Sequence, residues 1–294
     1  MLPARDRRPA TLTDRATVER GRDSAAGIDE LVAGVRCTID IEPPELVAGA
    51  QLVLPGRVGP QDQEAAPELT LRVQSAPPRS SNEGGDQGAE PLYVLLDDGR
   101  PVADPCSGVE VLRALEHHLR IWVSVLAPHC LLVHAGVVVW DGRAVVLPGP
   151  SGSGKSSLVL ALVRAGADFS SDDVAVIDPD GQVWPWPRPL RLRGTHEIEH
   201  PPVPPAPTGP ADVGTIVFAR FRPAEPWAQR ELGPATTAAR LLGNTPCART
   251  RPQLALSRCA ELARHARGHE VDRGEAADAA PRILALHRGL AAAR

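Results

Sequence analysis

Short apolar segments separated by proline- and glycine-rich stretches make up the first third of the chain. They are Leu31–Val35, Leu46–Leu54, Leu69–Val73 and Leu92–Leu96. Apolar segments of this length, bounded by turn-forming residues, are typical of β-strands. We therefore expect a small strand-rich N-terminal domain over residues 31–105. The polar, arginine-rich residues 1–30 show no periodicity, and we expect them to form a flexible arm.

The next segment, residues 106–129, has the pattern of an amphipathic helix. Apolar residues recur at steps of three and four, at Leu112, Leu115, Leu119, Trp122 and Leu126. Polar residues fall on the other face, at Arg113, Glu116, His117 and Arg120. Ser107 and Glu110 have the spacing of a capping box, and Pro128 ends the pattern. We expect this helix to link the N-terminal domain to the rest of the chain.

Residues 130–294 alternate between apolar strand segments and helical segments. The expected strands are Leu131–Val139, Arg143–Leu147, Val174–Ile177, Gln182–Trp184 and Val213–Phe221. Turn-forming residues at Asp141-Gly142 and at 178–181 separate neighbouring strands. The expected helices run from about Lys155 to Ala165, ended by Gly166, and over Pro252–Arg267 and Pro281–Ala293. This alternation indicates an α/β fold.

Residues 149–156 match the phosphate-binding pattern G-x-x-x-x-G-K-[ST] between an apolar strand and an apolar helix. Its glycines let the backbone N–H groups point at phosphate oxygens, and the helix that follows presents its free N–H groups to the same anion. Lys155 would bring a compact charge to the terminal phosphates, and Ser156 a hydroxyl ligand to Mg²⁺. We expect ATP with Mg²⁺ to bind here. The residues expected to bind it are Gly149, Ser151, Gly152, Ser153, Gly154, Lys155, Ser156 and Ser157.

Lys155 is the only lysine of the chain, because every other residue in the Lys and Arg total of 32 is arginine. The wide, planar guanidinium of arginine is a poor replacement for a compact ammonium in a tight cradle. A sequence that has kept lysine only at this position indicates that the position does not tolerate arginine.

Two adjacent carboxylates, Asp172 and Asp173, follow the loop closely. A helix from Lys155 to Ala165 is about 16 Å long, and an extended return as far as Asp172 covers about 20 Å. The chain can therefore fold back and place either carboxylate beside the phosphates. One would bind Mg²⁺ and the other would accept a proton from an attacking hydroxyl, and the sequence leaves open which does which. The structural alternative is an exposed turn that carries two acids.

The segment HAGVVVWDGRAVVLPGPSGSGKSSLVLALVRAGADFSSDDVAVI, residues 134–177, resembles the catalytic core of the HPr kinase/phosphorylase family. It is more similar to the kinase-like relatives of that family in biosynthetic and peptide-modification systems. The shared features are a histidine before the loop, the loop itself, a Gly-Ala pair after the helix, and the acid pair. The resemblance covers residues 130–190 well and is weaker through Val213–Pro223. Transporter ATPases carry their second carboxylate far downstream, after a signature motif that this sequence lacks.

The resemblance implies a mixed-sheet core related to phosphoenolpyruvate carboxykinase. It implies that Lys155 and Ser156 contact phosphate and metal, that Asp172 or Asp173 serves as metal ligand and catalytic base, and that His134 lies near the active site. The implied activity is transfer of the γ-phosphoryl group of ATP to a hydroxyl, with serine of a peptide or protein as acceptor. The glycine-rich signature of the bifunctional enzymes is missing, so phosphorylase activity is not expected. Because hexamers occur among the resembled enzymes, a homo-oligomer is one expectation.

Other patterns carry less weight. His196–His200 fits the zinc-protease pattern H-E-x-x-H, but Pro201-Pro202 follows at once and leaves barely one helical turn, so we do not expect zinc catalysis. Cations that could stabilise transferring phosphate, or simply face solvent, alternate along two segments at Arg188, Arg191, Arg193, Arg220 and Arg222. Trp184 and Trp186 either wall a pocket or pack into the core.

Composition and charge argue against several classes of partner and location. The net charge of −4 and the isoelectric point of about 6.1 argue against a nucleic-acid partner. No apolar run approaches the roughly 20 residues that span a bilayer, and the N-terminus lacks a signal-peptide pattern. The five cysteines show neither metal-ligand nor redox spacing, which is typical of free thiols. We expect a cytoplasmic protein without a membrane partner. The alternative to a kinase is a nucleotide-binding regulatory module with slow or no hydrolysis and no acceptor site.

Overall fold

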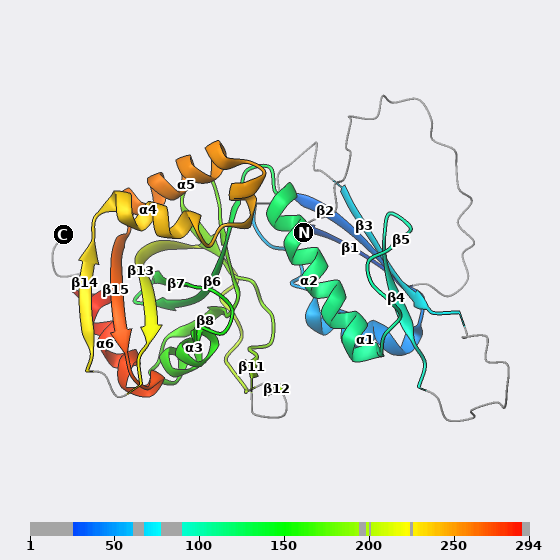
Figure 1. Cartoon of the computed structure of the whole chain (residues 1–294), viewed down its shortest axis with the longest axis horizontal. Helices are drawn as coiled ribbons and strands as arrows, with labels where there is room; N and C mark the ends of the chain where they lie inside the picture. Colours follow the sequence, from blue (N-terminus) through cyan, green and yellow to red (C-terminus); the bar gives the residue numbers. More distant parts are fainter. Residues whose placement is uncertain are drawn as a thin grey trace.

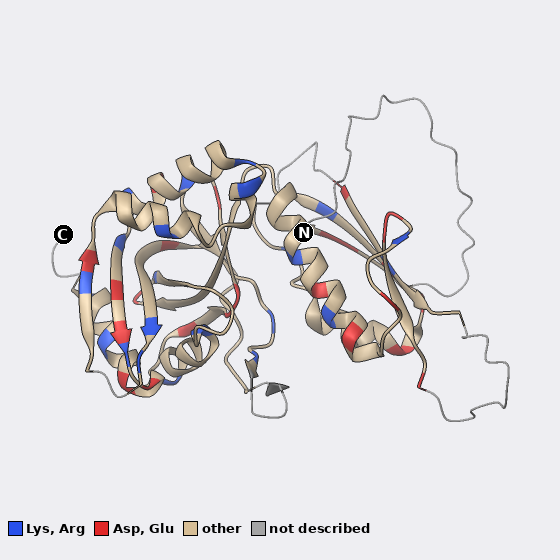
Figure 2. Ribbon diagram, in the orientation of Figure 1, with Lys and Arg blue, Asp and Glu red and all other residues tan. Residues whose placement is uncertain are grey.

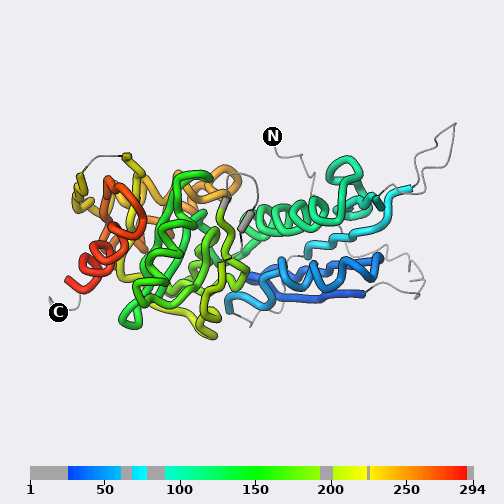
Figure 3. The backbone as a smooth tube through the Cα atoms, turned by 90° about the horizontal axis from the view of Figure 1, so that it is seen from below, coloured from blue at the N-terminus to red at the C-terminus, as the bar shows by residue number. Residues whose placement is uncertain are grey.

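The computed structural model describes residues 26–60, 68–77, 90–193, 198–199, 201–223 and 226–289. Over these residues the chain is a mixed α/β structure with a five-stranded sheet, an eight-stranded sheet and a separate strand pair (Figure 1). The smaller sheet with helices α1 and α2 lies at one end of the molecule, and the larger sheet with its helices at the other (Figure 3). Among the described helices, none combines the length and the apolar character needed to cross a bilayer.

The N-terminal sheet has its strands in chain order. They are β1 (Ala26–Val32), β2 (Val35–Ile41), β3 (Glu68–Ser75), β4 (Tyr93–Asp97) and β5 (Arg100–Pro101). Leu69, Leu71 and Val73 alternate with exposed residues along β3, so that one face of the sheet is apolar. β2 and β3 run parallel and therefore need a crossover connection, which contains helix α1 (Pro44–Val53).

Three expectations for this region are wrong. The segment Leu31–Val35 is not one strand, because it contains the turn at Ala33-Gly34 between β1 and β2. β1 begins at Ala26, so residues 26–30 belong to the sheet rather than to a flexible arm, and residues 1–25 lie outside the described part. The apolar run Leu46–Leu54 forms most of helix α1 instead of a strand. Leu46 and Ala50 are buried at a helical step of four, and Pro44 occupies the first helical turn, where proline is favoured.

Helix α2 (Gly108–Leu126) confirms the helical pattern. The Ser107 hydroxyl accepts a hydrogen bond from the Glu110 backbone N–H, and the Glu110 carboxylate accepts one from the Ser107 backbone N–H, which completes the capping box. Leu115 and Leu119 pack with the N-terminal sheet in a core that also contains Val174 and Trp186. This core therefore crosses the boundary expected near residue 130, and it confirms the packed-core interpretation of Trp186.

The larger sheet has the order β10-β9-β6-β7-β13-β15-β14, with β8 also paired to β6. The strands are β6 (Leu131–Trp140), β7 (Arg143–Pro148), β8 (Asp168–Ser171), β9 (Val174–Ile177), β10 (Gln182–Trp184), β13 (Ala211–Phe221), β14 (Ala228–Leu232) and β15 (Arg267–Arg273). β7, β13 and β15 run parallel, and the other pairs are antiparallel. The sheet is therefore mixed. Because parallel strands end at one edge of a sheet, the ends of β13 and β15 lie at the same edge as the loop after β7.

Helices cover both faces of this sheet (Figure 1). On one face, α4 (Pro234–Leu242) and α5 (Pro252–His265), joined by the short helix η1 (Pro246–Arg249), pack on strand residues such as Val146 and Ile216. On the other face, α3 (Lys155–Arg164) and α6 (Ala276–Arg288) pack on Val145 and Val217. Val145–Val146 and Ile216–Val217 are neighbours that point to opposite faces, as the strand period of two requires.

The C-terminal region differs from the sequence prediction. The helix expected over Pro252–Arg267 ends at His265, and Arg267–Arg273 form strand β15. This strand has the sequence RGHEVDR with Val271 as its only aliphatic residue, so no apolar run marks it. The last helix starts at Ala276 instead of Pro281.

Candidate active site

The phosphate-binding motif forms the connection between β7 and α3. Gly152 and Gly154 both have φ of +82°, a left-handed conformation that glycine adopts without strain. A Cβ at Gly154 would lie 2.6 Å from Nη2 of Arg273, whose guanidinium donates a hydrogen bond to the Gly154 carbonyl. Arg273 comes from the end of β15, the strand that the sequence did not reveal. The loop is therefore supported from the side by a neighbouring strand end.

Lys155 begins α3, and its side chain curls back over the loop. Its Nζ donates hydrogen bonds to the carbonyls of Gly149 at 2.8 Å and Pro150 at 2.9 Å. It also lies 3.1 Å from Nε2 of His134. The residue is 9 % exposed and lines a cavity, so that its charge is held between the loop and that cavity.

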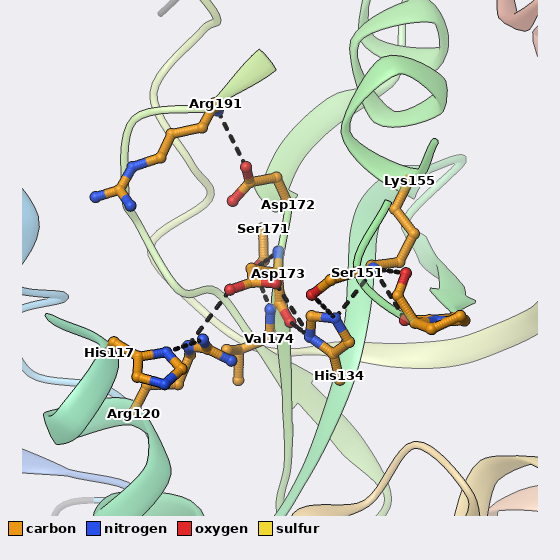
Figure 4. Close-up of polar contacts among 12 residues, drawn as sticks. His117, Arg120, His134, Ser151, Lys155, Ser171, Asp172, Asp173, Val174 and Arg191 are labelled. Carbon is orange, nitrogen blue, oxygen red and sulfur yellow. Dashed lines mark hydrogen bonds and ion pairs between the residues drawn. The ribbon is translucent and has the colours of Figure 1, made fainter. Parts of the chain in front are cut away.

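His134, on β6, connects Lys155 with Asp173. Its Nδ1 lies 3.0 Å from Oδ1 of Asp173. Figure 4 shows His134 between Asp173 and Lys155. A carboxylate only accepts, so Nδ1 carries the hydrogen, whereas an ammonium only donates, so Nε2 accepts from Lys155. These two partners fix the orientation of the imidazole ring between Lys155 and Asp173. The Ser151 hydroxyl lies 3.4 Å from the same Nε2.

The Asp173 carboxylate has partners on both sides. Burial raises its pKa, but the hydrogen bond from His134 and the charges of Arg120 and Arg188 outweigh that effect, so that the pKa lies well below the usual range. Nε of Arg120 is 3.4 Å from Oδ2 of Asp173, and Nη2 of Arg188 is 3.6 Å from it. Asp173 is therefore ionised at neutral pH.

Asp172 points to a different set of partners. Its Oδ1 lies 3.2 Å from Nη2 of Arg188, and its Oδ2 accepts a hydrogen bond from the backbone N–H of Arg191 at 3.1 Å. Its side chain is 4 % exposed, as is that of Arg188. The two neighbouring acids thus share Arg188 but otherwise face different elements.

Helix α2 contributes a buried acid, Glu116, which the sequence pattern placed on the polar face of the helix. The Glu116 side chain is 4 % exposed, and its Oε1 lies 2.5 Å from Nη1 of Arg188. The same Oε1 lies 3.5 Å from Nε of Arg120, and Oε2 lies 3.6 Å from Nη1 of Arg191. His117 accepts a hydrogen bond from Arg120, and burial together with the Arg120 charge lowers its pKa.

Apart from His134 and Arg273, which lie behind the lining, these groups line one cavity of about 560 Å³. The residues that line it are Arg113, Glu116, His117, Arg120, Ser151, Gly152, Gly154, Lys155, Ser156, Ser157, Asp172, Asp173, Arg188, Arg191 and Leu192. In Figure 4, His117 and Arg120 lie on one side of Asp173, and His134, Ser151 and Lys155 on the other. The volume of the cavity falls in the range of small-molecule sites, roughly 300–1,000 Å³.

Most of the residues expected from the sequence lie around this cavity, with some differences in detail. Gly149 contributes its carbonyl to Lys155, and Ser153 lines a small hollow on the other side of the loop. Arg220 and Arg222 pair with Asp272 and do not line the cavity, so only the Arg188 and Arg191 group fits the expected placement. The Arg193 side chain lies outside the described part.

The structure also bears on the H-E-x-x-H pattern and on Trp184. Residues 198–199 form strand β12, which pairs with β11 (Leu192–Arg193). The histidines of the H-E-x-x-H pattern, His196 and His200, lie outside the described residues. The Trp184 indole N–H donates to Asp178 at 2.8 Å, so that this side chain does not wall the cavity.

The donor set of the cavity suits magnesium rather than a transition metal. Ser156, Asp172 and Asp173 offer one hydroxyl and two carboxylates, the hard oxygen donors that Mg²⁺ prefers together with phosphate and water. No group of three or more His, Cys, Asp or Glu residues in the described ranges could hold a metal by itself.

Comparison with known proteins gives a distant likeness. No protein-family model matches the chain, and no curated protein matches it either. Among solved structures, the chain is similar to the HPr(Ser) kinase/phosphatase from Coxiella burnetii, with 16% sequence identity and a TM-score of 0.27. The match covers 54% of this chain and 94% of that protein.

Proposed function

We propose that the protein is an ATP-dependent kinase that transfers the γ-phosphoryl group to a serine hydroxyl of a peptide or protein. The observation that carries the proposal is the chain of contacts Asp173–His134–Lys155, which joins a buried carboxylate to the lysine of the phosphate loop. A loop that only bound nucleotide would not need an ionised carboxylate held by a histidine at this place.

Each residue has a defined part in the proposed reaction. Lys155 and the loop N–H groups hold the terminal phosphates, and Ser156 with Asp172 would hold Mg²⁺, which neutralises the charge of the phosphates when bound. Asp173 accepts the hydroxyl proton of the acceptor. The new bond joins the acceptor oxygen to the γ-phosphorus, the bond to the bridging oxygen breaks, and ADP leaves with the electron pair. His134 positions Asp173 relative to the loop.

The low pKa of Asp173 gives the arginines a role in this scheme. A carboxylate that is paired with Arg120 and Arg188 is a weak proton acceptor. If Arg120 or Arg188 turned to the transferring phosphate, the pKa of Asp173 would rise and its strength as a base would increase. The same movement would bring positive charge to the phosphate, where the transition state needs it.

The test uses ATP labelled in the γ position, Mg²⁺ and a pool of serine-containing peptides. The wild type should label peptide, and Lys155→Ala should lose both binding and labelling. Asp173→Asn should bind MgATP yet lose labelling by at least about a hundredfold, the lower end for one general base. Asp180→Asn serves as the matched control, because Asp180 is exposed and does not line the cavity.

The alternative, a regulatory nucleotide-binding module, makes a different prediction for the same assay. MgATP would bind to the wild type without label reaching any acceptor, and Asp173→Asn would change nothing. That pair of results would overturn the kinase proposal.

A further inference from the structure

Arg273, at the end of β15, is a buried cation that has no part in the reaction proposed above. The residue is 3 % exposed. Its Nη1 donates a hydrogen bond to the Gly274 carbonyl at 2.9 Å, and its Nη2 donates one to the Gly154 carbonyl at 3.1 Å. Burying a charge is unfavourable unless the group is hydrogen-bonded, and the acceptors here are backbone carbonyls, one of which belongs to the phosphate loop.

The neighbouring arginine Arg220 is paired in a different way. Figure 2 shows basic and acidic residues close together at the ends of β13 and β15, where Nε of Arg220 lies 2.7 Å from Oδ1 of Asp272. The charge acting on Arg273 is that of Glu275, which lies beyond the 4 Å of an ion pair. A carboxylate in contact would cancel the positive potential beside the loop, whereas carbonyl acceptors leave most of it in place.

Arg273 holds the loop from the side that faces away from the candidate active site. It lines a hollow of about 10 Å³ behind the loop and does not line the large cavity, whereas Gly154 and Lys155 line both. A hollow of that size has room for about one water molecule at most, so the contact is closely packed. The C=O and N–H of a trans peptide point in opposite directions. Because Arg273 binds the Gly154 carbonyl from behind, the N–H of the same peptide, which belongs to Lys155, is directed toward the cavity.

The loop needs such support because its glycines do not fix its conformation. Gly154 has φ of +82°, and glycine populates this and other conformations about equally well. The Leu158 N–H also donates to the Gly154 carbonyl, at 3.1 Å, as part of α3. Arg273 adds a charge-assisted bond from a different element, which ties the loop to the sheet. Holding a loop in its bound conformation before the ligand arrives lowers the entropy cost of binding.

We propose that Arg273 is a positioning residue for the nucleotide, which holds the Gly154–Lys155 peptide in the phosphate-binding conformation and adds a fixed positive charge behind it. This inference rests on the proposed binding of MgATP by the loop, and it adds a residue outside the loop motif on which affinity depends. The effect of Arg273 should follow the polyphosphate tail, because its guanidinium acts through the loop. Inorganic triphosphate, which has the tail without the base and the ribose, should therefore depend on Arg273 as strongly as ATP does.

The experiment compares wild type, Arg273→Gln and Arg273→Lys, with Arg282→Gln as the matched control. Arg282 is an exposed arginine of α6 outside both the cavity and the hollow. Calorimetry gives the Kd for MgATP and for inorganic triphosphate with Mg²⁺, and urea denaturation gives the free energy of unfolding of each protein without ligand. Because Lys155 is the only lysine, ¹⁵N-lysine labelling of wild type, Arg273→Gln and the control gives one backbone amide signal by NMR, that of the Gly154–Lys155 peptide.

Arg273→Gln should raise the Kd of both ligands at least about tenfold, the effect of losing one hydrogen bond to a charged group. Arg273→Lys keeps the charge but loses the planar fork, so it should raise both Kd values by a smaller factor. Without ligand, the Lys155 amide signal of Arg273→Gln should be broadened or split, and saturating triphosphate should restore a single signal. Arg282→Gln should match the wild type in every measurement.

A purely structural role predicts that Arg273→Gln lowers the free energy of unfolding while the folded protein keeps the wild-type Kd values. That result overturns the inference and leaves MgATP binding by the loop standing. A higher Kd for MgATP with an unchanged Kd for triphosphate also overturns it, because Arg273 would then serve the base or the ribose. If Arg273→Gln does not fold, a Kd of Arg273→Lys for triphosphate equal to that of the wild type overturns the inference. If the wild type binds neither ligand, the proposed function fails and the inference fails with it.

Discussion

Replacing Glu116 with glutamine tests how strongly α2 is tied to the candidate site. The Glu116 carboxylate is 4 % exposed and lies within 4 Å of Arg188, Arg120 and Arg191. Glu116→Gln keeps the shape of the side chain and removes its charge. Breaking a buried ion pair by removing one partner costs about 3–5 kcal/mol. Arg188 keeps Asp172 at 3.2 Å, so the cost should lie near the lower end, at about 3 kcal/mol.

The assay is urea denaturation followed by far-UV circular dichroism. Glu261→Gln is the matched control, because Glu261 forms an ion pair with Arg258 on α5 at 3.4 Å and its side chain is 43% exposed. An exposed pair of this kind contributes less than about 1 kcal/mol. A double-mutant cycle with Arg188→Met separates the pair from the other effects of each substitution, and should give a coupling energy of about 1–3 kcal/mol. If Glu116→Gln unfolds at the same urea concentration as Glu261→Gln, the network does not stabilise the fold and the reasoning is refuted.

Three further predictions follow from the loop and from Asp173. Gly154→Ala should abolish MgATP binding, because the φ of residue 154 is +82° and the added Cβ would meet Arg273. The control Gly142→Ala, at φ +74° with open space around it, should lower the free energy of unfolding by about 1–2 kcal/mol and leave MgATP binding intact. Equal MgATP binding by the two variants would contradict this. In Arg120→Ala, the pKa of Asp173 should rise toward its ordinary value, which a ¹³C-NMR titration of the carboxyl would detect, and an unmoved pKa would show that Arg120 does not lower it. Because folding lowers the pKa of Asp173, its ionisation stabilises the fold above about pH 4, and this contribution is lost as the pH falls below that value. The free energy of unfolding of Asp173→Asn should therefore fall less than that of the wild type between pH 6 and pH 3. Parallel curves of unfolding free energy against pH would show that the pKa of Asp173 is not lowered in the folded protein.

The helices and strands that were predicted correctly carry a strong local signal. α2 has both an apolar period and a capping box, and β6 and β7 flank the turn at Asp141-Gly142. The elements that were missed lack such a signal. β15 is a buried strand made mostly of polar residues, because its side chains pair with neighbours that are distant in the sequence: Glu270 with Arg240, and Arg273 with the phosphate loop. Long-range partners of this kind leave no mark in the local pattern.

The candidate site shows the same division. The loop and the acid pair are local motifs, and the fold brings Lys155 and Asp173 to the same cavity. Glu116 has the spacing of a solvent-facing residue of an amphipathic helix, yet the structure buries it. Its burial depends on how α2 packs against the larger sheet, and the pattern along one helix cannot reveal which part of its polar face another element will cover.

Helix α2 packs into the N-terminal core with Leu115 and reaches the cavity with Glu116, one residue further along. A change in the N-terminal core that shifts α2 would therefore also move Glu116 and alter the free energy of binding in the cavity. By thermodynamic reciprocity, a molecule that bound the N-terminal sheet and altered nucleotide affinity would have its own affinity altered by nucleotide by the same factor. The N-terminal sheet would then be an allosteric site for the phosphate loop, and α2 would couple the two.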